Sequence, residues 1–337
     1  MPLSDHLSMP VPLQGKDHPG LEGATANGFG AGGIRVFSRP LPIGPRIRDG
    51  LSLLLLFAAI AWFWQPLTAL YSLSQAQEHY SHIVLIPWLS LYALYLDRRV
   101  FLASREWSPM VGFMTIGAGA MGYWYAESAG SLTDQLATTI LALVVGCWGI
   151  FLLCYGVRAS RGVLFGLLFL LFMVPLPSAV LNGIIVFLQR SSAEVTDVVF
   201  SLLGVPVFRQ GFVFGLPNMT IHIAEECSGI RSTLSLCITS VVAGHFFLRS
   251  AWAKAGLVLM VVPLAIIKNA FRIVGLSLLA NYVDPSFITD SALHRYGGIP
   301  LFLVSLVVLF SLVWVLRRFE KRLGCCPPEK LRAKVCP

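Results

Sequence analysis

Cys227 differs from the other cysteines of this chain because ionisable residues surround it, in the segment A-E-E-C-S-G-I-R. An apolar run starts here, so we expect Cys227 in the first turn of a helix, near unpaired backbone N–H groups and the positive end of the helix dipole. These surroundings stabilise the thiolate, the nucleophilic form. Arg231 lies four residues further on and would share a helix face with Cys227. Glu225 and Glu226 would act as first-turn acids or cap partners. The alternative is a buried cysteine beside a helix cap.

Lys268 and Arg272 form a second group, in the segment K-N-A-F-R with Asn269 between them. They are four residues apart and therefore share a helix face. The apolar run continues beyond them to Leu279, so the two charges lie inside a hydrophobic stretch, where ionisable residues mark a functional site by default. We expect them to face the interior of a helix bundle or a wet cavity. A structural ion pair with one of the two glutamates beside the cysteine is the alternative.

His294, followed by Arg295, forms a third group just before the last apolar run. A histidine in an outer loop is more often only a solvated side chain. Together, however, a thiol, a guanidinium and an imidazole make an acyl-transfer set. The thiolate attacks a carbonyl, the imidazole gives a proton to the leaving amine, and the guanidinium stabilises charge on the tetrahedral oxygen.

The composition indicates that membrane helices must position these groups. Of 337 residues, 56% are apolar and 12% are charged, which is too little polar surface for a soluble fold. Apolar runs of about 17–25 residues recur, each long enough to cross a hydrocarbon core. A soluble enzyme, a disordered scaffold and a disulfide-rich secreted domain are excluded. The net charge of +8 reports orientation in such a protein, and we expect no nucleic-acid partner.

The apolar pattern predicts an all-α polytopic membrane protein of about eight spans, at about 51–73, 80–96, 109–126, 136–157, 162–182, 227–248, 254–280 and 299–316. Basic clusters follow every second span, and the N-terminal arginines precede the first. This places both termini on the cytoplasmic side. The predicted parts are a disordered cytoplasmic tail (1–49), the membrane domain (50–318) and a basic cytoplasmic tail (319–337).

Two stretches between spans are expected on the periplasmic side. The first, 183–226, starts with an amphipathic pattern typical of a helix at the membrane surface or packed over the bundle. From 205 to 223 the pattern alternates around Gly215-Leu216-Pro217-Asn218, which predicts a small β-hairpin that leads to Cys227. The second stretch, 281–298, contains the histidine.

The chain resembles the exosortase/archaeosortase family of multi-pass membrane cysteine transpeptidases, of the bacterial exosortase type. The resemblance depends on E-C-S-G-I-R around Cys227, N-A-F-R ending at Arg272 and L-H-R-Y-G-G around His294, and it covers about residues 50–318. It implies a Cys227–Arg272–His294 active site at the outer face of the inner membrane. The N-terminal extension and the cysteine-containing tail fall outside the shared pattern.

The resemblance also implies the substrate: exported proteins that end in a sorting signal, which is a short motif, a transmembrane helix and a basic end. The enzyme would cleave near the motif and transfer the acyl group to an acceptor at the cell surface. This acceptor would be a lipid or a glycan, such as an exopolysaccharide component. No cofactor is expected. Cys325, Cys326 and Cys336 lack the spacing of a zinc site, so no metal is expected either. The alternatives are a transporter or flippase for polysaccharide or lipid-linked sugar, with Lys268 and Arg272 holding an anionic headgroup, and a non-catalytic envelope assembly factor.

Overall fold

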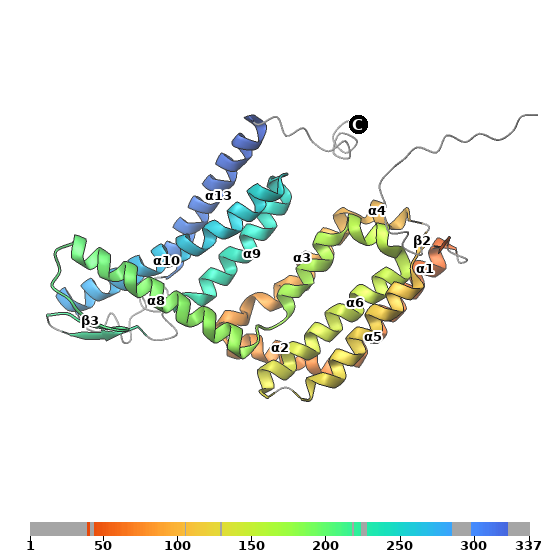
Figure 1. The fold of residues 1–337 in the computed structure, drawn as a ribbon, viewed down its shortest axis with the longest axis horizontal. Helices are drawn as coiled ribbons and strands as arrows, with labels where there is room; N and C mark the ends of the chain where they lie inside the picture. Colours follow the sequence, from red (N-terminus) through yellow and green to blue (C-terminus); the bar gives the residue numbers. More distant parts are fainter. Residues whose placement is uncertain are drawn as a thin grey trace, which may run out of the picture. The chain divides into compact units, whose positions relative to one another are not determined.

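The computed structural model describes residues 39–40, 44–104, 106–128, 130–217, 219–223, 228–284 and 298–322. Every described residue belongs to the unit Phe37–Pro337. The predicted N-terminal tail falls largely outside the described residues, as do residues 323–337 and residues 285–297, which include His294. The elements carry the labels of Figure 1.

The first part of the fold is helical. Its elements are α1 (Pro45–Trp62), α2 (Trp64–Ala76), the 3-10 helix η1 (Glu78–Leu85), α3 (Ile86–Leu96), α4 (Arg98–Leu102), α5 (Pro109–Ala126), α6 (Leu132–Gly162), α7 (Leu164–Phe169) and the 3-10 helix η2 (Leu170–Met173). Helices α5 and α6 pair along their length, and the two short strands β1 (Arg39–Pro40) and β2 (Glu106–Trp107) pair beside them.

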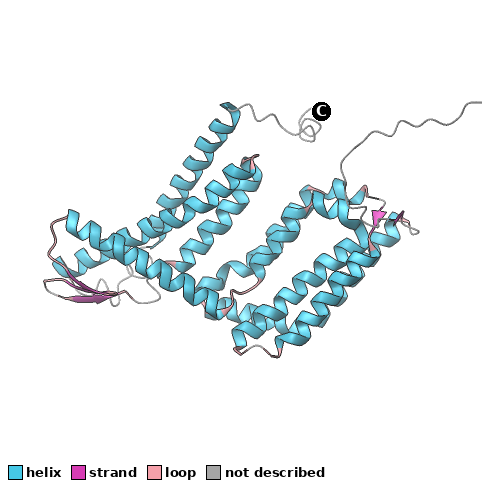
Figure 2. Ribbon diagram, in the orientation of Figure 1, coloured by secondary structure: helices cyan, strands magenta, loops and turns pink. Residues whose placement is uncertain are grey.

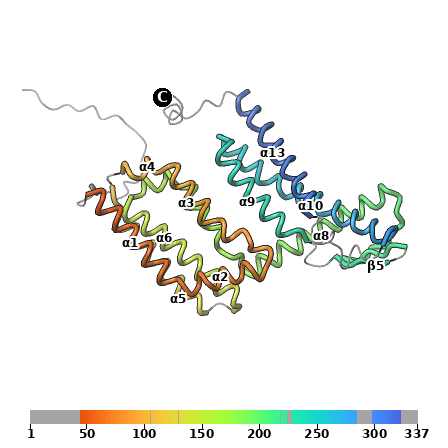
Figure 3. Tube along the Cα trace, turned by 180° about the vertical axis from the view of Figure 1, so that it is seen from behind, coloured from red at the N-terminus to blue at the C-terminus, as the bar shows by residue number. Residues whose placement is uncertain are grey.

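The second part combines long helices with a small sheet, shown in magenta in Figure 2. Its helices are α8 (Ser178–Leu202), α9 (Ile230–Phe247), α10 (Ala251–Tyr282) and α13 (Gly298–Arg322). Its strands are β3 (Phe208–Gln210), β4 (Val213–Gly215) and β5 (Thr220–His222). Helices α9, α10 and α13 pack against one another, and we call them the C-terminal bundle (Figure 3). Leu236, Leu257 and Leu309, one from each helix, are fully buried in its core.

Four helices of the described part are long and apolar enough to cross a membrane: α6, α9, α10 and α13. The number rises to six if each of two bent pairs, α1 with α2 and α7–η2 with α8, is one span. The fold is therefore that of a helical multi-pass membrane protein, but the predicted number of eight spans is not confirmed. The other two predicted spans, 80–96 and 109–126, correspond to η1 with α3 and to α5. Helix α3 has 11 residues, about 16 Å of helix, against a hydrocarbon core of about 30 Å.

Prolines explain where the two bent pairs depart from straight predicted spans. The helix axis turns by 66° between α1 and α2, where Pro66 follows the break, and by 86° between η2 and α8. The second break lies in V-P-L-P, and Pro175 and Pro177 each lack a backbone N–H and fix φ. The predicted amphipathic segment that begins at 183 is consequently part of α8, which already starts at Ser178.

The sheet in the C-terminal part has the antiparallel order β3-β4-β5 within the described residues. The predicted turn around Gly215 connects β4 to β5, as the alternating pattern indicated, but a further strand, β3, pairs with β4 through a turn at Gly211. Phe214 of the central strand is buried against Phe200 of α8, in a cluster that includes Ile273 of α10. The sheet is therefore fixed to α8 and α10, and its location relative to a membrane stays a prediction.

Arg48, expected in the N-terminal tail, lies in α1 with only 3% of its surface exposed. Its guanidinium donates hydrogen bonds to the backbone carbonyls of Ser104 and Leu102, forms an ion pair of 2.9 Å with Asp49, and lies 4.7 Å from the ring centre of Tyr155. This arginine therefore fixes the start of α1 to α6 and to the segment after α4.

Candidate active site

Asn269 joins three helices at the candidate site. Its side-chain amide donates a hydrogen bond to the hydroxyl of Ser192 in α8, at 3.1 Å, and the residue is 1% exposed on α10. On its other side it contacts Gly229, which immediately precedes α9: a Cβ atom at Gly229 would lie 3.0 Å from Cγ and Oδ1 of Asn269. The backbone at the start of α9 therefore lies directly against α10.

Gly229 has a φ of +75°, in the left-handed region that favours glycine, and it separates α9 from the chain before it. Helix α9 begins at Ile230, so the prediction of a helix that starts at Cys227 is wrong by three residues. Two predictions depend on that start: the position of Cys227 in the first helical turn, and the helix face that Cys227 would share with Arg231. Ser228, 1% exposed, accepts a hydrogen bond from the backbone N–H of Ile230 at 3.4 Å.

Lys268 is bound to the same turn. Its ammonium group donates to the hydroxyl of Ser232, which in turn donates to the carbonyl of Gly229 at 2.9 Å. The hydroxyl and the backbone N–H of Thr233 donate to that carbonyl as well, at 2.9 and 3.0 Å. Lys268 is 8% exposed, so it faces the protein interior as expected. Its contacts fix the turn before α9.

Arg272 lies on the same face of α10 as Lys268 and Asn269, because it follows them by four and three residues. It is half-buried. Along the helix it lies about 4.5 Å from Asn269, which contacts the turn at Gly229. Arg272 therefore lies on the face of α10 against which the start of α9 packs.

Arg231 has a different environment. Its guanidinium forms an ion pair of 2.8 Å with Glu78 of η1, and the two side chains are 59% and 80% exposed. Such a surface pair stabilises a fold by about 1 kcal/mol or less. In the structure Arg231 therefore connects α9 to η1. No local pattern indicated this partner, because 153 residues separate the two.

The remaining candidates lie outside the described residues: Cys227, Glu225, Glu226, His294 and Arg295. Both described neighbours of the segment 224–227 are held in place. Ile223, 1% exposed, accepts a hydrogen bond from the side chain of Gln189 in α8 at 3.2 Å. Ser228 lies next to Gly229, against α10. Ile223 is therefore fixed to α8, and Gly229 packs against the face of α10 that carries Arg272.

Glu320, near the end of α13, fixes the direction of the helices in the C-terminal bundle. Its carboxylate accepts hydrogen bonds from the backbone N–H groups of Arg249, at 3.1 Å, and Ser250, at 2.7 Å, in the turn from α9 to α10. Helix α13 therefore runs parallel to α9 and antiparallel to α10 (Figures 1 and 3). At about 1.5 Å per residue, the start of α9, Arg272 and the start of α13 lie about 26, 32 and 33 Å from this turn. All three are at the same end of the bundle.

The polar contacts that α8 makes were not among the predicted features of the site. Gln189, Ser192 and Thr196 are 5%, 0% and 0% exposed. Their spacing of three and four residues puts them on one helix face, opposite to the charged face of the helix. A stripe of polar residues at helical spacing was the available signal, and two of its members make the contacts: Gln189 with Ile223 and Ser192 with Asn269.

His79 lies on η1 next to the Glu78–Arg231 pair. Its ring packs on Tyr80 with 4.3 Å between ring centres, and burial lowers its pKa from the ordinary value of 6.5. Among the described residues, no group of three or more His, Cys, Asp or Glu side chains could hold a metal ion. The tail cysteines Cys325, Cys326 and Cys336 lie outside that range.

Long apolar helices with a lysine, an asparagine and an arginine between them define a multi-pass membrane protein with a polar interior. The family model of the transmembrane exosortases (Exosortase_EpsH) matches residues 74–311, and the chain belongs to this family. The match extends from α2 into α13 and includes the cysteine, arginine and histidine motifs. No curated protein and no solved structure matches the chain.

Proposed function

We propose that the protein is a membrane cysteine protease and transpeptidase that cleaves C-terminal sorting signals of exported proteins. The thiolate of Cys227 attacks the scissile carbonyl, and Arg272 stabilises the charge on the tetrahedral oxygen. His294 protonates the leaving amine, so a thioester forms as the peptide bond breaks. A nucleophile of a cell-surface glycan or lipid then displaces the thiolate and takes the acyl group. Glu225, Glu226 and Arg295 flank the reacting groups, whereas Lys268 and Asn269 position the turn before α9.

The observation that carries this proposal is the contact of Gly229 with Asn269. Cys227 is covalently bonded to Ser228, and consecutive Cα atoms are about 3.8 Å apart. Ser228 precedes the residue that packs on α10, one helical turn from Arg272. His294 precedes the start of α13 by four residues, and that start lies at the same end of the bundle. These positions support convergence of the thiol, the guanidinium and the imidazole.

The position at one end of the spans suits the proposed substrate. The helix of a sorting signal remains in the bilayer, so its scissile bond lies just outside the hydrocarbon. An enzyme with its nucleophile at that depth reaches the bond without extracting the substrate, and confinement to the membrane raises the effective concentration. We place this end at the periplasmic face of the inner membrane, because the basic clusters lie at the opposite end.

The test is processing of a tagged protein from the same genome that ends in a short motif, a transmembrane helix and basic residues. Cys227→Ala abolishes processing at unchanged expression, as does His294→Ala. Arg272→Gln lowers the rate by about 10²–10³, the effect of losing one oxyanion donor. Cys237→Ala, a change at a free thiol of α9, is the matched control and retains processing.

Full processing by the Cys227→Ala variant would overturn the proposal. If Arg272→Gln blocked export of a polysaccharide or lipid-linked sugar while Cys227→Ala did not, the protein would be a transporter or flippase. If neither cysteine nor histidine were needed for envelope assembly while the chain itself was, it would be an assembly factor. A thioester trapped on Cys227 with the substrate fragment, detected by mass spectrometry, supports the enzyme directly.

A further inference from the structure

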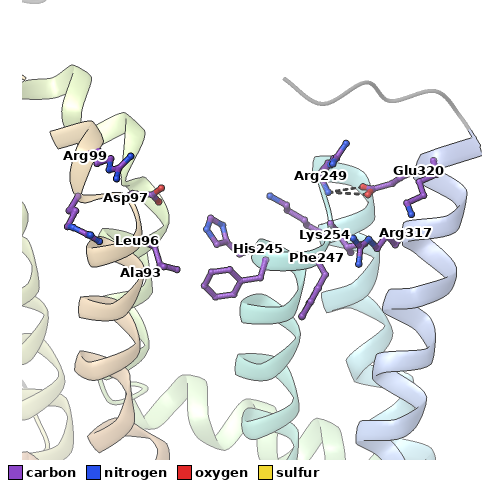
Figure 4. Close-up of a pocket in the computed structure, with 14 residues that line it drawn as sticks. Ala93, Leu96, Asp97, Arg99, His245, Phe247, Arg249, Lys254, Arg317 and Glu320 are labelled. Atoms are coloured by element: carbon purple, nitrogen blue, oxygen red, sulfur yellow. Dashed lines mark hydrogen bonds between the residues drawn. The ribbon is translucent and has the colours of Figure 1, made fainter. Parts of the chain in front are cut away.

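A second polar site lies at the opposite end of the C-terminal bundle from Arg272. Here the ends of α3, α9 and α13 and the start of α10 line a pocket of about 860 Å³ (Figure 4). Arg99 and Asp97 lie on one side of it, and Lys254, Arg249 and Arg317 lie on the other. This pocket does not touch any residue of the proposed active site, which lies about 30 Å away along the helices.

The charge of the pocket is strongly unbalanced. Six basic side chains line it: Arg98, Arg99, Arg249, Lys254, Arg317 and Lys321. The acidic side chains are Asp97 and Glu320, and Glu320 is already occupied by the backbone N–H groups of the α9–α10 turn. No ion pair between described residues includes any of the six cations. Like charges gathered around a partly enclosed space repel one another unless an anion lies among them.

The floor of the pocket is apolar. Ala93 and Leu96 line it from α3, and Phe246, Phe247 and Leu248 line it from the end of α9. Phe246 and Phe247 are 44% and 47% exposed, so they present ring surface to an occupant. A cationic rim above an apolar floor matches an amphiphile, whose phosphate lies at the rim and whose first acyl carbons lie on the rings. A free phosphate ion would leave that floor unused.

The level of the pocket relative to the membrane also fits a lipid headgroup. Trp314 of α13, 54% exposed, is covered by the guanidinium of Arg318 at 3.7 Å from the ring centre. Exposed tryptophan and arginine side chains at the end of an apolar helix mark the membrane–water interface. Basic pockets between membrane helices on the cytoplasmic side bind the headgroups of anionic lipids.

We propose that this pocket binds the phosphate of an anionic membrane phospholipid, which bridges the basic side chains of α3–α4 to those of α10 and α13. The phosphate supplies the counter-charge that the pocket lacks. The acyl chains lie against the two phenylalanines and continue into the bilayer. The site is separate from the proposed peptidase chemistry and is tested without it.

The test uses the full chain, purified in a neutral detergent and delipidated. Native mass spectrometry and thermal unfolding are measured with phosphatidylglycerol, with phosphatidylcholine and with inorganic phosphate. We expect phosphatidylglycerol to bind and to raise the unfolding temperature, phosphatidylcholine to bind at least tenfold more weakly, and inorganic phosphate at equal concentration to have no effect. Arg99→Gln/Lys254→Gln/Arg317→Gln weakens phosphatidylglycerol binding at least tenfold.

The matched control is Arg161→Gln/Arg318→Gln/Arg322→Gln, which removes the same charge from residues that do not line the pocket. It changes phosphatidylglycerol binding less than threefold. Equal losses in the two triple variants, or equal binding of the two lipids by the wild type, would overturn the proposal. Stabilisation by inorganic phosphate equal to that by phosphatidylglycerol would instead identify a soluble phosphate site. The single variants Arg99→Gln and Arg317→Gln, on opposite walls, give the same test if the triple variant does not fold.

Discussion

Gly229→Ala tests whether the turn before α9 is held against α10 as tightly as the site requires. Two separate effects oppose the new methyl group. A left-handed backbone costs an L-residue about 1–2 kcal/mol, and the φ of Gly229 is +75°. The new Cβ would also lie 3.0 Å from Cγ and Oδ1 of Asn269, and overpacking of this kind costs about 1–3 kcal/mol. We therefore expect the variant to lose about 2–5 kcal/mol of unfolding free energy.

The two effects are separable because only one of them involves Asn269. In an Asn269→Ala background the steric contact disappears, so Gly229→Ala should cost only the backbone part, about 1–2 kcal/mol. The coupling between the two positions, measured as a double-mutant cycle, is then about 1 kcal/mol or more. The measurement is equilibrium unfolding in detergent micelles, with processing of the tagged substrate measured in parallel.

Gly256→Ala is the control, because Gly256 lies in α10 and a methyl group added there would meet no atom within 4 Å. Replacing a helical glycine at this position should stabilise the protein by about 0.5–1 kcal/mol. An equal cost of Gly229→Ala in both backgrounds would show that the turn does not press on Asn269. The contact that supports the active-site proposal would then be absent, and the reasoning would fail.

Two further predictions concern other parts of the fold. Arg48→Ala should lower the unfolding free energy by about 3 kcal/mol, because it removes a buried cation from an ion pair and from two carbonyl acceptors. Arg158, whose side chain is 82% exposed, pairs with Glu106, so Arg158→Ala should cost about 1 kcal/mol or less in the same unfolding assay. Equal costs of the two variants would contradict the burial argument. Burial lowers the pKa of His79 below its unfolded value of 6.5, so the unfolded state binds the proton more tightly. The unfolding free energy should therefore fall as the pH drops below about 6.5. His79→Gln should reduce this dependence in a pH series of unfolding curves, and an unchanged dependence would show that His79 is not its source.

Periodicity and charge predicted those parts of the fold that depend on local pattern. The helical membrane class, the turn between β4 and β5, and the inward position of Lys268 all follow from residues within a few positions of one another. The start of α9 was predicted too early because hydrophobicity alone cannot show that Gly229 adopts a left-handed backbone. The bends at Pro66 and at Pro175–Pro177 were not predicted, because mean hydropathy over a span of about 20 residues does not register a single proline.

The contacts that hold the site together could not be predicted, because they join residues far apart in the chain. Ser192 and Asn269 are separated by 77 positions, and Glu78 and Arg231 by 153. Nothing in either local sequence indicates the partner. The motifs of the exosortase family pointed to these segments, and the fold shows that two of them meet: Lys268 and Asn269 of α10 contact the start of α9 and the turn that precedes it.

The bond between Glu320 and the α9–α10 turn has a mechanical consequence for α13. One face of the helix is packed along its length, because Ser305, Leu309 and Val313 are 2%, 0% and 5% exposed, whereas Val304 and Val307 on the outer face are 60% and 66% exposed. The helix is therefore held both at its carboxyl end and along its side. With a length of about 33 Å, a tilt of about ten degrees around Glu320 would displace Gly298 by about 6 Å. The packed face resists such a tilt and so fixes the point at which the chain enters α13.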